Sequence, residues 1–202
     1  MAPGANSKVA PAIVEECETA IARADVLLAQ LETPLDAFMT AARIARAHGT
    51  VVVLNPAPAA HLPDRVWALT DVLTPNQHEM AEMFGNREAG PAASQYRQWD
   101  LDLVVTRGRE GAAWTGATGT RTYPAFPAEA IDTTGAGDAF NAGLAVGIAE
   151  EGIEAGILLG LRAGAFAVTR MGVLDGLATR AQLDAAFPMF HPLSGSPERS
   201  RS

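Results

Sequence analysis

One segment of the sequence combines a glycine-rich loop, a carboxylate and the start of an apolar helix. Residues 132–143 read Asp-Thr-Thr-Gly-Ala-Gly-Asp-Ala-Phe-Asn-Ala-Gly, and Asp138 stands where the predicted helix begins. Glycines let the backbone approach a ligand closely, and the first N–H groups of a helix lack intrahelical partners, so this loop can bind a phosphate group. A carboxylate there can accept a proton from a hydroxyl that attacks the phosphate. The alternative is an Asp that only caps the helix after a flexible turn.

Two further groups of residues have types and spacings suited to a phosphate ligand. Asn76 and Glu79 are three positions apart at the start of a predicted helix, so both face the same side. This pair could instead form a capping box, in which each side chain bonds to the backbone N–H of the other residue. Residues 106–111 follow a predicted strand, and α/β sheets bind ligands at the carboxyl ends of their strands. An ordinary hairpin turn is the alternative for that segment.

The elements that must position these residues alternate between strand and helix. Short apolar runs predict buried strands, apolar residues at helical spacing predict helices, and three prolines make residues 55–63 a loop. Such alternation implies a doubly wound α/β fold, with a mainly parallel sheet covered by helices on both faces. We expect one domain over residues 1–190 and a disordered polar tail over residues 191–202. The predicted strands are 26–31, 50–54, 71–74 and 101–106, followed by a hairpin to Phe126, and the predicted helices are 9–24, 34–47, 76–84, 136–151, 154–170 and 179–187.

The charge balance argues against two kinds of partner. Lys and Arg number 15 and Asp and Glu number 23, which gives a formal net charge of −8 and a pI of about 4.9. An acidic chain does not favour non-specific binding to nucleic acid or to an anionic membrane surface. No apolar run approaches the roughly 18 residues of a membrane span, and the first residues lack the pattern of a signal peptide. We therefore expect no nucleic-acid partner and no membrane partner.

The single cysteine, Cys17, lies on the apolar stripe of the first predicted helix, and we expect it to be a small buried residue. With one cysteine, no disulfide can form within the chain, which is typical of a reducing cytosol, so the expected location is cytoplasmic. The histidines show no metal-ligand spacing and receive no role: His48, His61, His78 and His191.

The segment that begins at Asp132 closely resembles the second signature of the ribokinase (PfkB) family of carbohydrate kinases. The resemblance implies a ribokinase-like fold and the ATP-dependent phosphorylation of the primary hydroxyl of a sugar. Residues 55–58, Asn-Pro-Ala-Pro, look more like the ribokinases of this family than the fructokinases or adenosine kinases, which implies D-ribose as substrate and ribose 5-phosphate as product. Other segments resemble the family in the same order along the chain: 2–6, 29–34, 54–58, 74–79, 105–111 and 168–172.

The resemblance also implies roles for individual residues. Asp138 matches the catalytic base, and Gly135, Ala136 and Gly137 match the anion hole, whose N–H groups can follow charge onto the transferring phosphoryl group. Glu32 and Asp138 match sugar ligands, although Glu32 could instead cap the helix that Pro34 opens. The implied ATP-binding residues are Asn76, Thr106, Arg107, Gly108, Arg109, Glu110, Gly111, Gly137 and Asp138.

Two cations are implied in the same way. Glu79 matches a residue tied through water to Mg²⁺, the cofactor of ATP, and Mg²⁺ keeps most of its waters in such sites. A monovalent-cation loop would bind K⁺, a hard ion that prefers oxygen ligands. For Asp132, a turn-forming role is the alternative. The residues that match the K⁺ loop are Asp132, Thr134, Ala167, Arg170 and Gly172.

The sequence departs from the family pattern in several places. The first strands of the family's sheet, its small β lid and further sugar contacts have no counterpart here, and we expect an exposed apolar sheet edge that favours pairing into a homodimer. Leu161 stands where ribokinases often have Asn or His near the adenine, and Gly176 stands where a Ser helps to close the cation loop. Two other functions stay open: a sibling sugar or nucleoside kinase, and a non-catalytic nucleotide-binding remnant.

Overall fold

The fold is built on one six-stranded sheet. The computed structural model describes residues 4–84 and 99–188, so the predicted tail at 191–202 lies outside the described residues. The strands follow one another across the sheet in chain order. Strands β1 to β4 pair in parallel, whereas β5 pairs antiparallel with both β4 and β6. This arrangement confirms the predicted mainly parallel sheet. The strands are β1 (Val26–Ala29), β2 (Val51–Leu54), β3 (Val72–Leu73), β4 (Asp102–Thr106), β5 (Ala112–Gly116) and β6 (Gly119–Tyr123).

Strands β2 and β3 and the middle of β4 are continuously apolar because both faces of this part of the sheet are buried. Val52 and Leu54 of β2 belong to one hydrophobic core, whereas Val53 between them belongs to the other. In β4, Leu103 and Val104 divide in the same way. Successive side chains of a strand point to opposite faces, so a run without polar residues is needed when both faces are covered.

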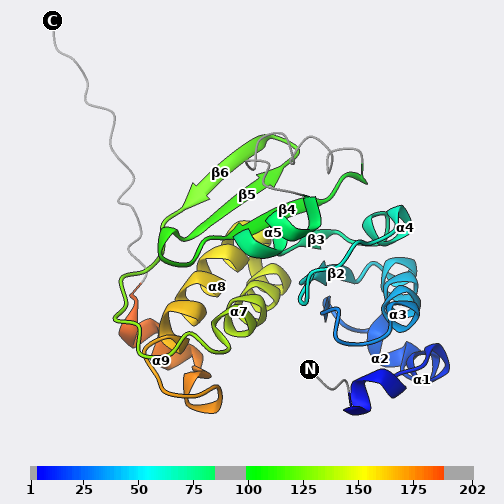
Figure 1. Cartoon of the computed structure of the whole chain (residues 1–202), viewed down its shortest axis with the longest axis horizontal. Helices are drawn as coiled ribbons and strands as arrows, with labels where there is room; N and C mark the ends of the chain where they lie inside the picture. Colours follow the sequence, from blue (N-terminus) through cyan, green and yellow to red (C-terminus); the bar gives the residue numbers. More distant parts are fainter. Residues whose placement is uncertain (1–3, 85–98, 189–202) are drawn as a thin grey trace, which may run out of the picture.

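Helices cover both faces of the sheet, as Figure 1 shows. One face packs against α3 (Leu35–His48), α4 (Asp64–Trp67) and α5 (Gln77–Phe84), and the other against α7 (Ala136–Glu151) and α8 (Ile153–Ala167). The predicted doubly wound fold is therefore confirmed. The remaining elements are α1 (Pro11–Glu16), α2 (Glu18–Ala22), α9 (Arg180–Ala186) and the short 3₁₀ turns η1 (Gly4–Lys8), η3 (Gly108–Glu110) and η4 (Leu174–Gly176).

Glycines let α7 and α8 pack backbone against backbone. A Cβ atom added to Gly143 would lie 2.9 Å from the Cα of Gly160, and one added to Gly147 would lie 2.5 Å from the Cα of Gly156. Both distances are too short for real side chains, so larger residues at these positions would push the helices apart. The close contact fixes α7, and with it the loop that precedes α7, relative to the rest of the fold.

Several predictions about individual elements were wrong. The helix expected at 9–24 divides into α1 and α2 at Cys17, whose N–H donates to the carbonyl of Val14 three residues back, which tightens the chain there. Cys17 is exposed, not buried. Strand β1 ends at Ala29, two residues earlier than predicted, and α4 was not predicted at all.

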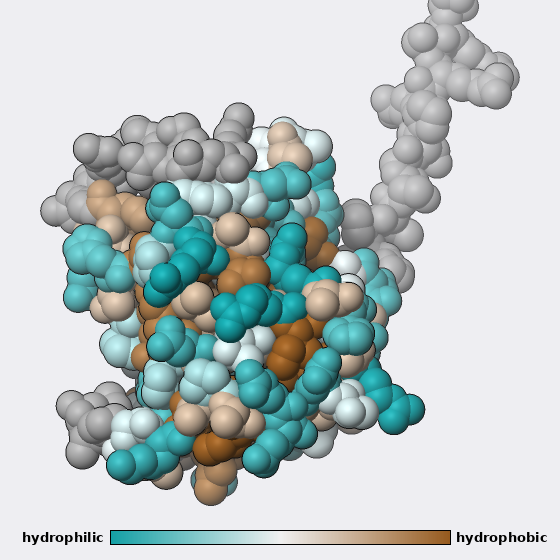
Figure 2. Space-filling view, turned by 90° about the vertical axis from the view of Figure 1, so that its right-hand side faces the viewer, coloured by the Kyte–Doolittle hydropathy of each residue, from teal (hydrophilic) through white to brown (hydrophobic). Residues whose placement is uncertain are grey.

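Figure 2 shows the side of the molecule that carries α1 to α4, where apolar and polar surface are interleaved. In the part of the chain that the structure describes, no helix is long and apolar enough to cross a membrane.

Asp102, at the start of β4, is a half-buried carboxylate. The indole Nε1 of Trp114 donates to its Oδ1 over 2.7 Å. Burial raises the pKa of Asp102 above its ordinary value of 3.8, and the Trp114 hydrogen bond only partly offsets this effect. A carboxyl group with a raised pKa in the folded state costs stability once the pH exceeds the unfolded value, because the unfolded chain then ionises more readily.

We therefore predict that Asp102→Asn raises the melting temperature at pH 7, since Asn keeps an acceptor for Trp114 and carries no charge. The gain should shrink as the pH falls toward about 4 and vanish below it, where Asp102 is protonated in both states. Thermal unfolding followed by circular dichroism between pH 3 and 8 would measure it. Asp102→Ala, which loses the hydrogen bond, should not give the gain. A melting temperature for Asp102→Asn below that of the parent chain at pH 7 would contradict this account.

Candidate active site

The loop before α7 leaves open space at the helix N-terminus. Gly135 caps the helix with a φ of 76°, a left-handed conformation that favours glycine, and a Cβ there would lie 3.2 Å from Val173 Cγ1. Gly137, in the first turn, differs, because a Cβ there would meet no protein atom within 4 Å. A residue without a side chain therefore keeps this space free beside the first turn of α7. There the Ala136 N–H donates to the carbonyl of Thr133 over 3.3 Å, whereas the N–H groups of Gly137 and Asp138 make no backbone hydrogen bond within the described residues. Such a cradle suits a phosphate group.

Asp138 projects from the same first turn and is exposed. The side-chain Nε2 of Gln30 donates to its Oδ1 over 2.7 Å. Gln30 directly follows β1, and the early end of that strand leaves its side chain free to reach across to α7. Gln30 was not predicted as a site residue, because it lies 108 positions from Asp138 and no sequence pattern links the two.

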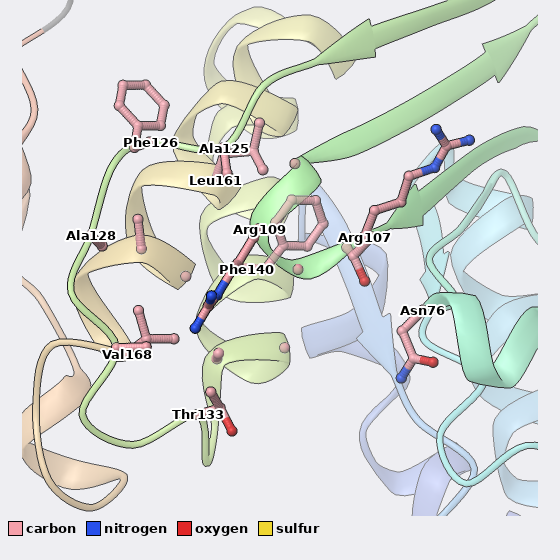
Figure 3. Close-up of a pocket in the computed structure, with 18 of the residues that line it drawn as sticks. Asn76, Arg107, Arg109, Ala125, Phe126, Ala128, Thr133, Phe140, Leu161 and Val168 are labelled. Carbon is pink, nitrogen blue, oxygen red and sulfur yellow. The ribbon is translucent and has the colours of Figure 1, made fainter.

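A cleft of about 560 Å³ lies beside this turn (Figure 3). Ala136 and Gly137 form part of its wall. The cleft also collects most of the residues predicted to bind ATP, and His78, which received no role, is part of the wall as well. Glu110 is not among the lining residues, and Asp138 faces a different cavity. The predicted residues in the wall are Asn76, Thr106, Arg107, Gly108, Arg109, Gly111 and Gly137.

Asn76 and Glu79 form the capping box that was the alternative for this pair. Asn76 N–H donates to Glu79 Oε2 over 2.8 Å, and Glu79 N–H donates to Asn76 Oδ1 over 2.9 Å. A β-bridge joins Asn76 to Thr106, which places the pair at the carboxyl end of β4. Burial raises the pKa of Glu79, while the bond from Asn76 opposes that shift. The Asn76 amide NH₂ and the second carboxylate oxygen of Glu79 are not used by the box.

A smaller cavity of about 260 Å³ lies on the other side of Asp138. Its wall contains polar side chains from three parts of the chain: the residues after β1 and β2, and α7. Of these side chains, only Asp138 was predicted as a site residue. The residues that line it are Leu28, Ala29, Gln30, Asn55, Asp138 and Asn141.

Buried hydrogen bonds tie this cavity to the phosphate cradle. Thr74 Oγ1 donates to Asn141 Oδ1 over 2.6 Å, and Asn141 Nδ2 donates to the carbonyl of Gly137 over 3.0 Å. Asn55 Nδ2 donates to the carbonyl of Thr74 over 2.7 Å. All three side chains are buried. Their only signal in the sequence is a polar residue at a strand end or on an apolar helix.

Glu32, the predicted sugar ligand, is exposed and lines neither cavity. Its Oε2 accepts a bond from Asn6 Nδ2 over 3.2 Å. The capping alternative for Glu32 is wrong, because the N-terminus of α3 at Pro34 has no side-chain cap. The structure thus places Glu32 outside the smaller cavity, beside the first described turn of the chain.

The residues of the predicted K⁺ loop lie together. Asp132 accepts bonds through Oδ1 from the N–H of Thr134, over 2.9 Å, and through Oδ2 from the N–H of Gly172, over 3.0 Å. Hydrogen bonds from Thr134, and then from Gly172, lower the pKa of Asp132. The bond to Thr134 two residues on is also the turn that was the alternative. The carbonyl of Ala167 accepts the N–H of Arg170.

The donor set of this loop fits a hard cation. It offers a carboxylate and several carbonyls, and each of these oxygens has a lone pair beyond the hydrogen bond it already accepts. Gly176 is buried, and a Cβ there would lie 3.3 Å from the Cα of Ala167. A side chain at Gly176 would therefore require Ala167 to shift. In the described ranges 4–84 and 99–188, no group of three or more His, Cys, Asp or Glu residues could hold a metal ion.

Comparison with known proteins finds similar sequences in longer chains. The sequence is 38% identical over 189 residues to ribokinase from Haemophilus influenzae, covering 90% of this chain and 62% of that protein. It is 30% identical over 177 residues to a deoxyribokinase from Salmonella typhi, covering 84% of this chain and 58% of the relative. The chain therefore spans about three fifths of the length of the curated relatives it matches.

Solved structures of ribokinases have a fold similar to that of this chain. Ribokinase from Thermotoga maritima matches with a TM-score of 0.82 and 28% identity, over 91% of this chain and 62% of that one. Arabidopsis thaliana ribokinase, solved with ribose and ATP, matches with a TM-score of 0.81 and 22% identity, over 87% of this chain and 59% of that one. The model of the pfkB family of carbohydrate kinases matches residues 2–180 of this chain. The chain therefore belongs to the PfkB family of carbohydrate kinases.

Proposed function

We propose that this chain supplies the nucleotide site and the catalytic base of a kinase that transfers the γ-phosphoryl group of ATP to the primary hydroxyl of a sugar. The observation that carries the proposal is the position of Asp138 between two cavities. Its neighbours Ala136 and Gly137 line the larger cleft, while Asp138 itself lines the smaller one. A base between a nucleotide and a sugar can take a proton on one side while phosphate is transferred on the other.

In the larger cleft, the triphosphate would lie at the polar end. Asn76 and Arg107 lie at that end in Figure 3, and the open N-terminus of α7 adds backbone N–H groups. The purine would then lie at the opposite end, which is apolar. Mg²⁺ bound with ATP would neutralise phosphate charge, and the free groups of Asn76 and Glu79 would hold it through water.

The reaction follows from this placement. A primary hydroxyl in the smaller cavity gives its proton to Asp138, and its oxygen bonds to the γ-phosphorus as the bond to the ADP oxygen breaks. The N–H groups of residues 135–137 stabilise the charge on the phosphoryl oxygens as it moves. Gln30 holds the Asp138 carboxylate through Oδ1 and leaves Oδ2 for the hydroxyl.

D-ribose is the sugar we propose, since the ribokinase of Haemophilus influenzae is more similar to this chain than the deoxyribokinase is. The deoxyribokinase likeness supports a sibling sugar kinase as the second candidate. The Arabidopsis protein with this fold was solved with ribose and ATP, which supports the pairing of a sugar with a nucleotide.

We also propose K⁺ as an activator bound at Asp132, because the loop that contains Asp132 gathers oxygen ligands next to the phosphate cradle.

The proposal can be tested directly by measuring ATP binding and ribose phosphorylation with this chain alone. We predict that it binds ATP·Mg in calorimetry but phosphorylates ribose far more slowly than ordinary kinases, which turn over on the order of 1–100 times per second. The reason is that Glu32 lies outside the smaller cavity, so few groups orient the sugar and water has access. Ribose-dependent ADP release would measure the rate. Ribose phosphorylation at ordinary kinase rates would contradict this account, and a folded chain without detectable ATP binding would contradict the proposed nucleotide site.

Asp138→Asn should lower kcat by at least roughly 10²-fold, the lower range for loss of a general base. ATP affinity should stay nearly unchanged, because Asn still accepts the bond from Gln30 and the cradle is intact. A chimaera that joins the N-terminal part of the Haemophilus influenzae relative to this chain would give rates high enough to measure. Asp36→Asn is the matched control, because Asp36 is exposed in the first turn of another helix, α3. Turnover near that of the parent in the Asp138 variant would refute the assignment.

K⁺ should raise the melting temperature or the ATP·Mg affinity of the chain more than Na⁺ does at equal ionic strength. Differential scanning fluorimetry in the two chloride salts would measure the difference. Asp132→Asn should abolish it, because the loop loses its carboxylate. Asp175→Asn should preserve it, since Asp175 is exposed in the turn η4 and is not a hydrogen-bond partner of Asp132 in the described structure. Equal responses of the parent chain to K⁺ and Na⁺ would count against a selective site.

A further inference from the structure

The two ends of the larger cleft differ in their capacity to form hydrogen bonds. Polar side chains, among them Asn76 and Thr106, line the end that would hold the triphosphate. At the opposite end, where Figure 3 places Phe126, Ala128 and Leu161, the lining side chains are apolar. They are Ala125, Phe126, Ala128, Leu161, Ala165 and Val168. A base bound here would be surrounded mainly by carbon.

The purines of ATP and GTP differ at the edge that such a wall would have to read. Adenine presents an amino donor at its 6-position, whereas guanine presents a carbonyl acceptor there, and both present the acceptor N7. A side chain that selects adenine must accept a hydrogen bond from the amino group. None of the lining side chains at the apolar end carries an acceptor.

Arg109 is the charged side chain that extends toward this end. In Figure 3 its guanidinium points toward Val168, while the Arg107 side chain points away from it. A guanidinium only donates hydrogen bonds, so it can bond to N7 of either purine and to the 6-carbonyl of guanine, but not to the amino group of adenine. Arg109 thus does not favour adenine.

The backbone of residues 125–130, which lies along the apolar end of the cleft, does not distinguish adenine from guanine either. Within the described residues, the N–H and C=O groups of residues 125–130 make no backbone hydrogen bond. Each of these residues except Pro127 offers both a donor and an acceptor, so the segment can satisfy an amino group or a carbonyl.

From these observations we infer that the cleft accepts GTP as well as ATP as phosphoryl donor, and that Arg109 is the residue that allows guanine. The inference rests on the proposed nucleotide site and deepens it. A pocket that reads a ligand by shape discriminates by up to about 10²-fold, whereas a pocket built to hydrogen-bond one ligand rejects its analogue by about 10⁴-fold or more. The Kd of GTP·Mg should therefore lie within about 10²-fold of the Kd of ATP·Mg.

Calorimetric titration of the folded chain with ATP·Mg and with GTP·Mg, followed by displacement of one by the other, tests the inference. Mutual displacement with Kd values within about 10²-fold would support it. Binding of ATP·Mg with a larger preference over GTP·Mg would overturn it and leave the proposed kinase function standing. Binding of neither nucleotide would contradict the proposed nucleotide site, and this inference with it.

Two exchanges test the role of Arg109. Arg109→Gln should weaken GTP·Mg binding by more than ATP·Mg binding, because Gln replaces the charged guanidinium fork with one neutral NH₂ group and adds a carbonyl that can accept a bond from adenine. Arg107→Gln removes the same charge at the polar end and should weaken both nucleotides by the same factor. Arg109 is exposed and Arg107 half-buried, and circular dichroism would confirm that both variants fold. Equal losses for the two nucleotides in Arg109→Gln would overturn the role given to Arg109.

Discussion

The site depends on the close contact between α7 and α8. At Gly143 and Gly147 the two helix backbones approach so closely that a Cβ would lie 2.9 and 2.5 Å from the Cα atoms of the facing glycines. Packed backbones have no side-chain rotamers to absorb a displacement. The phosphate cradle and Asp138 occupy the first turn of α7, so they move only if this whole contact moves. Buried Asn141 adds a second attachment, because it bonds both to the cradle at Gly137 and to Thr74 of the sheet.

The parallel sheet brings the other half of the site to the same place. Gln30, Asn55 and Thr74 each follow directly after a strand, and Thr106 is the last residue of β4. Parallel strands end at one edge, so these polar residues gather there although they are far apart in the chain. Although the net charge is −8, the helix N–H groups and Arg107 give this edge a locally positive field that would suit a polyphosphate.

Local patterns in the sequence sufficed for the parts that depend on neighbours in the chain. The apolar runs at β2 and β4 predicted buried strands because both faces of the sheet are covered. The spacing of Asn76 and Glu79 allowed a capping box, which is present. The glycine-rich segment before α7 predicted a helix N-terminus that can bind an anion, since that property belongs to a loop and a single turn.

Contacts between distant residues could not be predicted in this way. Gln30 meets Asp138 across 108 positions and Asn141 meets Thr74 across 67, and neither pair leaves a periodic signal. The division of the first helix at Cys17, and the exposure of that cysteine, also depend on which surfaces pack around it. The sequence by itself determined the buried strands, the glycine-rich loop at the start of α7 and the family, because these follow from adjacent residues. Only the tertiary structure decided which polar groups face Asp138, because hydrogen bonds across a sheet depend on where chain segments meet in space.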